Sequence, residues 1–166
     1  MNNYHATPFD QSASGFYFDN YEDYQTKAKN HTNEYGQVVE EFRIQFIDGD
    51  NHQLFSGLGI NQANLETWFN DFENLDGDDL IRAIYMAEYL IIDISEILDR
   101  LDEVGLFQGR AKDYAAEYIE DSGLLDDMPE NLRYYFDTEA FARDMLLSGD
   151  INEVEIMHST YVIWEC

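Results

Sequence analysis

The chain has 166 residues, of which 45% are hydrophobic and 15% aromatic, and its 35 Asp and Glu against 9 Lys and Arg give a net charge of −26. The hydrophobic content is sufficient for folded cores, so the composition indicates an ordered protein with an extremely acidic surface. Such a surface repels nucleic acid and anionic lipid and attracts basic surfaces, so we expect neither a nucleic-acid partner nor a membrane partner. A solvated surface that serves only solubility is the simplest alternative explanation.

Cysteine usage and the absence of targeting signals predict a cytoplasmic protein. Cys166 is the single cysteine, so no internal disulfide is expected. Residues 1–14 have neither the basic segment nor the apolar core of a signal peptide, and no apolar run approaches the ~18 residues of a spanning helix. The acidity is spread along the chain, with a net charge of −6 over residues 1–60 and −10 over each of 61–105 and 106–166.

The first part of the chain is expected to form a small sheet with a helix. Tyr21 and Tyr24 recur at helical spacing. Phe42, Ile44 and Phe46 alternate as in a half-buried strand, and a turn follows them. In chain order the pattern predicts a strand at 15–19, a helix at 20–30, a strand at 38–48 and a partner strand at 52–58.

The middle of the chain is expected to be a helical bundle. Leu65, Trp68 and Phe72 lie on one side of a predicted helix over residues 60–75. After a break at "DGDD", apolar residues at alternating spacings of four and three predict one long helix over residues 78–105. That helix is apolar almost all round, so we expect it to be the buried spine of this section.

The last part of the chain is expected to be α+β. The pattern predicts helices at 110–123, 129–136 and 139–147, followed by two closing strands within residues 151–166. Gly123 is a plausible C-terminal cap of the first of these helices, and Asp137 or Thr138 is expected to cap the third. The predicted fold class is α+β, with three small domains at residues 1–59, 60–105 and 106–166.

No motif indicates catalysis, a cofactor or a metal. The four histidines show no metal-ligand spacing, and no nucleophile elbow, phosphate-binding loop or dinucleotide fingerprint occurs. "DGDN" at 48–51 lacks the glycine and the glutamate of a calcium loop. We therefore expect no catalytic residues, no bound metal and no cofactor, and a metal-dependent hydrolase is the weakest of the possible functions.

One predicted helix carries an unusual face of like charges. Asp113, Glu117 and Glu120 share a face of the helix at 110–123, with Asp121 beside them and no base between. Like charges three or four residues apart destabilise a helix by a few tenths of a kcal/mol per pair. A sequence breaks such a rule where function demands it, and a rigid row of carboxylates resembles a row of phosphates. Substituting these acids singly is expected to weaken a partner's binding slightly, and substituting many to weaken it strongly.

A family resemblance gives this acidity a specific meaning. Residues 128–150, "MPENLRYYFDTEAFARDMLLSGD", closely resemble the C-terminal signature of the ArdA family of antirestriction proteins. That signature has an I/M-P pair, a leucine, an aromatic-x-D, then A-F/Y-A-R-D and G-D, which match Met128-Pro129, Leu132, Tyr135-Phe136-Asp137, Ala140-Phe141-Ala142-Arg143-Asp144 and Gly149-Asp150. Among these, Pro129, Tyr135, Phe141 and Gly149 are expected to specify the fold, and Arg143 to form an internal ion pair.

The resemblance implies an elongated, curved protein of three small domains. It further implies a homodimer, joined through residues 106–166, that mimics bent B-DNA and occupies the DNA-binding groove of type I restriction–modification enzymes. Such proteins are encoded on mobile genetic elements and use no cofactor. The alternative is an acidic protein-interaction module that inhibits another DNA-binding protein, such as a CRISPR effector, a nucleoid protein or a regulator.

Two sets of site residues follow. We expect the phosphate-mimicking carboxylates to be Asp93, Glu96, Glu103, Asp113, Glu117, Glu120, Asp121, Asp126, Asp127, Glu130, Asp137 and Glu139. The closing strand has apolar residues on both faces, and its cover is expected to come partly from a second copy. The expected dimer contact consists of Tyr161, Ile163 and Trp164.

Overall fold

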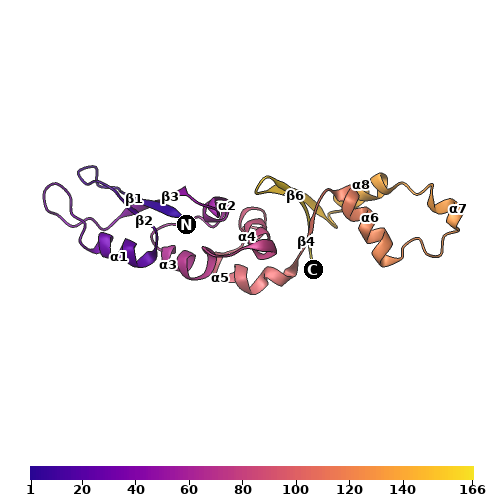
Figure 1. Ribbon diagram of the computed structural model, residues 1–166, viewed down its shortest axis with the longest axis horizontal. Coiled ribbons are helices and arrows are strands. Elements are labelled where there is room, and N and C mark those ends of the chain that lie inside the picture. Colours follow the sequence, from indigo (N-terminus) through magenta and orange to yellow (C-terminus); the bar gives the residue numbers. More distant parts are fainter. The chain divides into compact units, whose positions relative to one another are not determined.

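A computed structural model describes residues 1–166 and divides them into two compact units, residues 1–94 and 95–166. Together the units contain eight α-helices and two three-stranded antiparallel sheets, one sheet in each unit (Figure 1). The mixed α+β class expected from the sequence is confirmed. The division into three small domains at residues 1–59, 60–105 and 106–166 stays a prediction.

The sheet of the first unit has the order β2-β1-β3, with β1 (Asn3–Pro8) at its centre, β2 (Phe16–Phe18) and β3 (Phe42–Asp48). Helix α1 (Tyr21–Lys29) begins at Asn20, whose side chain accepts a hydrogen bond from the Asp23 backbone N–H. The predictions for β2, α1 and β3 are confirmed. The central strand β1 was not predicted, because "NYHATP" has little apolar alternation of its own and is a strand only through its two neighbours.

The predicted partner strand at 52–58 is wrong, since these residues form helix α2 (His52–Gly57). Two facts explain the difference. β1 already pairs with the inner edge of β3, and the adjacent residues Leu54 and Phe55 are both buried, which a helix allows and a strand with one solvated face does not. The side chain of Asn51 ties the start of α2 to the backbone carbonyls of Glu73 and Leu75.

The helix predicted over 60–75 is present but shorter, as α3 (Leu65–Thr67) followed by the π-helical turn η1 (Trp68–Phe72). Its predicted apolar residues Leu65, Trp68 and Phe72 are fully buried. The Trp68 Nε1–H donates to the Tyr4 hydroxyl at 2.8 Å, and that hydroxyl donates to the Glu73 carboxylate at 3.0 Å. This buried network joins η1 to the central strand of the sheet.

The single long helix predicted over 78–105 is wrong. Helix α4 (Gly77–Glu88) ends early, Ile91 takes a positive φ of 54°, and three short elements follow: α5 (Ile94–Ile97), the 3-10 turn η2 (Leu98–Glu103) and strand β4 (Val104–Gln108). The run "LIIDI" is rich in β-branched residues, which lose side-chain freedom in a helix. The apolar spacing therefore extends beyond the C-terminus of α4, although the helix itself does not.

The sheet of the second unit has the order β4-β6-β5, with β5 (Asn152–Ile156) and β6 (Ser159–Glu165) joined by a two-residue turn. Met157 and His158 both take positive φ in that turn, as tight hairpins require. The closing strands were predicted, whereas β4 was not. Trp164 lies over Gly105 on the neighbouring strand, so close that an added Cβ at residue 105 would lie 2.0 Å from the ring.

Three helices complete the second unit: α6 (Ala111–Ser122), α7 (Glu130–Arg133) and α8 (Thr138–Ser148). All three were predicted, and Gly123 and Asp137 cap α6 and α8 as expected. The small residues Ala111, Ala115 and Ala142 let α6 and α8 pack on Val162 of the sheet. Within this unit, α7 lies at the end remote from the sheet (Figure 1). None of the helices in the chain combines the length and apolar character needed to cross a membrane.

Candidate protein-binding surface

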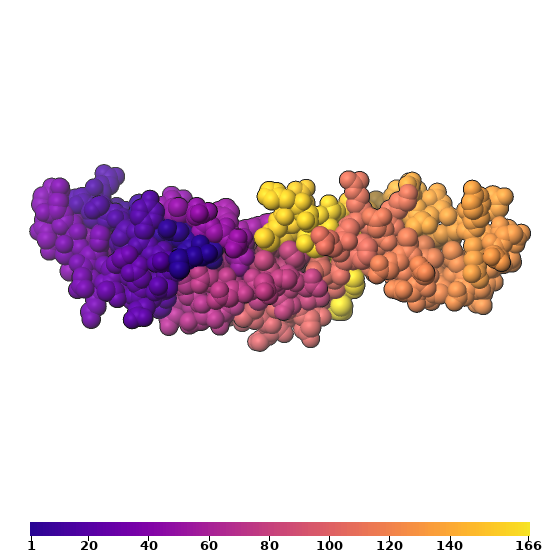
Figure 2. All heavy atoms as spheres, in the orientation of Figure 1, coloured from indigo at the N-terminus to yellow at the C-terminus, as the bar shows by residue number.

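The acidity is shared equally by the two units. Residues 1–94 contain 17 acidic and 4 basic residues, and residues 95–166 contain 18 and 5, so each unit has a net charge of −13. The twelve carboxylates expected to mimic phosphates are all exposed. Eleven of them belong to the second unit, and Asp93 belongs to the first. The space-filling view shows the acid-rich helical segments of the second unit in orange (Figure 2).

Helix α6 presents its acids on the outside. Ala111 and Ala115 face the core, whereas Asp113, Glu117 and Glu120 are exposed. Asp113 accepts a hydrogen bond from the backbone N–H of Arg110, which begins the helix. The last turn contains no basic residue, so the acids there meet the negative end of the helix dipole without compensation.

Some of the twelve carboxylates are already engaged within the chain. Arg100 forms ion pairs with Glu96 at 3.5 Å and Glu103 at 2.8 Å, and Lys112 pairs with Glu139 at 2.6 Å. The hydrogen bond to Glu103 raises the pKa of Arg100, and the hydrogen bond to Glu139 raises the pKa of Lys112. These three acids are therefore partly neutralised. Asp137 is engaged differently, because its carboxylate accepts the Ala140 N–H at the start of α8.

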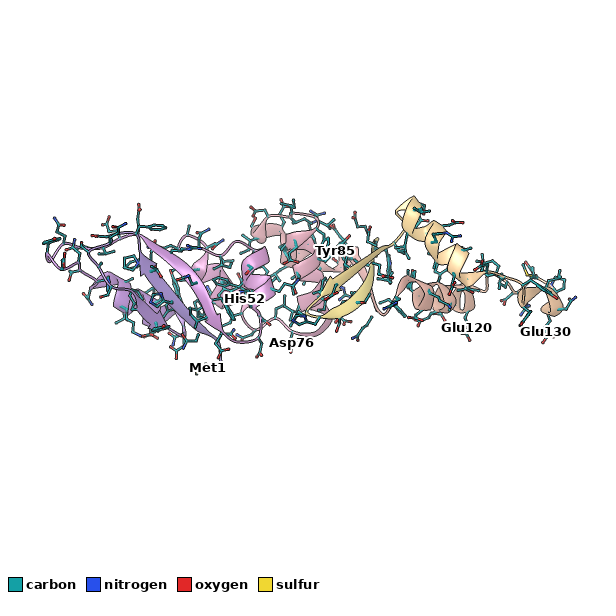
Figure 3. The ribbon with its side chains drawn as sticks, turned by 90° about the horizontal axis from the view of Figure 1, so that it is seen from above. Met1, His52, Asp76, Tyr85, Glu120 and Glu130 are labelled. Carbon is teal, nitrogen blue, oxygen red and sulfur yellow. The ribbon has the colours of Figure 1, made fainter.

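Six of the predicted carboxylates form neither an ion pair nor a side-chain hydrogen bond within the chain. We call them the open array: Glu117, Glu120, Asp121, Asp126, Asp127 and Glu130. They extend from the last turns of α6 through the following loop to the start of α7, and Figure 3 shows Glu120 and Glu130 on those two helices. Their charge is uncompensated by the chain, so it is available to a basic partner. The sequence predicted their exposure but not which acids would be unpaired.

Asp93, Glu96 and Glu103 do not lie on one helix, because the long helix predicted over residues 78–105 is divided. Asp93 precedes α5, Glu96 lies on α5, and Glu103 ends η2. Arg143 was expected to form an internal ion pair, but it is exposed and no acid lies within ion-pair distance.

Apart from Asp93, the acids of the first unit were absent from the predicted site. Exposed carboxylates gather before and in the first turn of α4, at Asp71, Asp76, Asp78 and Asp79. Of these, Asp79 pairs with Arg82 at 3.1 Å. The net charge of −10 over residues 61–105 was the sequence feature that could have indicated these acids. Because their position at a helix N-terminus also stabilises α4, the charge alone did not distinguish a structural role from a binding role.

The residues expected at a dimer contact lie on β6, the central strand of its sheet. Ile163 is fully buried, whereas Tyr161 and Trp164 are half-buried. The Trp164 ring also contacts Tyr114 of α6, with centroids 4.9 Å apart. Any contact between copies at this strand would therefore involve the exposed parts of Tyr161 and Trp164. The dimer contact stays a prediction.

A hollow of ≈ 570 Å³ in the first unit is lined mainly by aromatic, aliphatic and amide side chains around Tyr24 and Phe42. No group of three or more His, Cys, Asp or Glu side chains is arranged to hold a metal ion. What the surface offers is negative charge on an ordered scaffold.

Comparison with known proteins identifies what uses such a surface. No curated protein matches the chain. The sequence model of the family described as antirestriction protein (ArdA) matches residues 20–160, which include strands β3, β4 and β5, all eight helices and the open array. Proteins of this family are non-enzymatic. The chain therefore belongs to the ArdA family of antirestriction proteins, DNA mimics that inhibit type I restriction enzymes.

Proposed function

We propose that this protein inhibits a type I restriction–modification enzyme by placing the open array in the enzyme's DNA-binding groove, where the carboxylates replace phosphates. The observation that carries the proposal is that these six exposed carboxylates lack internal partners although the second unit has five basic residues. A surface that served solubility alone would gain stability from pairing its acids with those bases.

The charge density of α6 fits this role. Asp113 to Asp121 span eight residues, or ~12 Å of helix axis at 1.5 Å per residue. Four acids over that length give one charge per ~4 Å, close to the ~3.4 Å between phosphates along one strand of B-DNA. Helix α6 is held by its contacts with α8 and by the cap at Gly123, so the charges are presented by a rigid element. Such an array binds through many modest contacts.

We further propose that two copies form a homodimer through the second unit and act as an elongated mimic in the bacterial cytoplasm. The net charge of −26 per chain equals that of ~44 Å of duplex, and a dimer would match ~88 Å. Because two such charged bodies repel each other, salt should tighten the dimer while it weakens binding to the target. Sedimentation at low and high salt measures the first effect. A chain that stays monomeric at micromolar concentration in moderate salt would contradict the dimer.

A phage-plating assay tests the inhibition. A host with a type I system is challenged with unmodified phage, with and without the protein, and we expect the protein to restore plating. The matched variant replaces the six acids of the open array by amides and should lose most of this effect, while single amide variants should lose little. Unchanged plating with the wild-type protein would contradict the proposal.

The alternative partner, another DNA-binding protein, remains a distinct outcome of the same design. The open array carries charge and no base-specific chemistry, so a different basic groove of similar width could accept it. A protein that leaves type I restriction intact but inhibits a CRISPR effector, nucleoid protein or regulator in vitro would favour that alternative.

A further inference from the structure

The side chains of two tyrosines next to the open array are highly exposed. Three aromatic residues follow α7 directly, at Tyr134, Tyr135 and Phe136. Phe136 is half-buried and contacts Phe141, which packs against the core of the second unit. Tyr134 and Tyr135 are 88% and 79% exposed, and the only ring contact of either is with the other, at 5.6 Å and nearly perpendicular. We call these two residues the aromatic pair.

The aromatic pair is presented by an ordered turn. The guanidinium of Arg133 donates to the backbone carbonyls of Met128 at 3.0 Å and Asp126 at 2.7 Å. The backbone N–H of Tyr135 donates to the Leu132 carbonyl at 3.1 Å, which closes the turn after α7. The rings therefore leave the surface from a fixed backbone, so little conformational freedom of the chain is lost when a partner binds them.

The surroundings of the aromatic pair restrict its partner to a basic surface. Residues 121–139 contain six acids and one base, and that base, Arg133, is used by backbone carbonyls. Tyr134 keeps helical backbone angles, so Glu130, one turn earlier, lies on the same side. Nucleic acid and anionic membranes are repelled by such a segment. A second copy of the chain is not expected at this place, because the proposed dimer contact lies on β6, whereas α7 lies at the end of the unit remote from the sheet (Figure 1).

We infer that the aromatic pair is an anchor that stacks on arginine side chains in the DNA-binding groove of the target enzyme, beside the open array. The inference rests on the proposed function. Grooves that bind DNA use arginine extensively, and a guanidinium stacks on the face of a tyrosine ring. Exposed tyrosine is also among the residue types that dominate binding energy at interfaces. The neighbouring carboxylates compensate the charge of the arginine that stacks there.

The inference separates two contributions to affinity. Carboxylates of the open array act through charge, so their contribution falls as salt rises. The aromatic pair acts through ring contact and desolvation, so its contribution depends far less on salt. Removing the rings should therefore lower affinity by a similar factor at every salt concentration, whereas neutralising the acids should reduce the salt dependence itself.

The test measures the affinity of a purified type I restriction enzyme for four forms of the full chain over a series of salt concentrations. The forms are the wild type, Tyr134→Ala/Tyr135→Ala, Tyr134→Phe/Tyr135→Phe and the control Tyr35→Ala, which removes a ring that is 74% exposed in the first unit. We expect the double alanine variant to bind at least ~10-fold more weakly with an unchanged salt slope. The double phenylalanine variant keeps both rings and should bind like the wild type, as should the control.

Several outcomes overturn the inference. One is a double alanine variant that binds as tightly as the wild type, and another is a phenylalanine variant that loses as much affinity as the alanine variant. A third is a change in self-association on sedimentation, which would assign the rings to contact between copies. The thermal unfolding temperature of the double alanine variant should equal that of the wild type. If that variant does not fold, the affinities of the single variants Tyr134→Ala and Tyr135→Ala test the inference in the same way. A wild-type protein that does not bind the enzyme contradicts the proposed function itself.

Discussion

Neutralising the end of α6 should make this protein more stable and a weaker inhibitor. The triple variant Glu117→Gln/Glu120→Gln/Asp121→Asn keeps side-chain shape and removes three charges that form no ion pair. It abolishes three like-charge pairs at helical spacing, since Glu117 lies four residues from Asp113 and Asp121 and three from Glu120. It also removes acids from the negative end of the helix dipole.

The expected gain in the free energy of unfolding is about 1–2 kcal/mol. Each like-charge pair costs ~0.2–0.5 kcal/mol, and each exposed acid near the helix C-terminus costs ~0.3 kcal/mol or more at low ionic strength. For a chain of this size, that gain corresponds to a rise in Tm of roughly 2–8 °C. Circular dichroism at low salt measures it. At ~1 M salt, where the Debye length is ~3 Å, most of the gain should disappear.

The matched control variant should be less stable than the wild type. Asp23 lies in the first turn of α1 and pairs with Lys27 at 2.7 Å, so Asp23→Asn should lower Tm. The reasoning is refuted if the triple variant is no more stable than the wild type at low salt, or if its gain is equally large at high salt. Increased stability together with weaker inhibition would show that the unpaired acids are retained for function at the expense of stability.

Three substitutions test contacts within each of the two units. Gly105→Ala should destabilise the second sheet by ~1–3 kcal/mol, because its Cβ would lie 2.0 Å from the Trp164 ring, and a neutral effect in urea unfolding would show that the ring moves freely. Tyr4→Phe should cost ~1–3 kcal/mol, because it leaves the buried Trp68 N–H unpaired, and an unchanged unfolding midpoint would contradict the network. Asp137→Ala removes the N-cap of α8 and should cost ~1 kcal/mol, while Asp137→Asn should recover most of the loss.

The parts of the fold that the sequence predicted are those with local signals. α1, α6 and α8 have regular apolar spacing and identifiable caps, and β5 and β6 are close in sequence. β1 and β4 are strands because distant segments pair with them, which no local pattern records. The predictions for residues 52–58 and 78–105 were wrong for a related reason. Short apolar runs satisfy both helical and strand patterns, and burial in the folded unit decides between them.

The candidate site was predictable in kind but not in detail. Exposure of the twelve acids followed from their charge, because an unpaired carboxylate is rarely buried. Which acids pair depends on the positions of Arg100 and Lys112 in the folded unit, so the open array was visible only there. Tyr135 was expected to specify the fold, as aromatic residues commonly do, yet it is almost fully exposed beside Tyr134.

Competition with DNA tests most directly the claim that this protein replaces DNA through its carboxylates. A labelled duplex bound to a purified type I restriction enzyme is titrated with the protein at several salt concentrations. The protein should displace the duplex completely, and its own affinity should fall steeply and linearly on a log–log plot against salt. Simultaneous binding of duplex and protein, or an affinity that does not change with salt, would contradict the account.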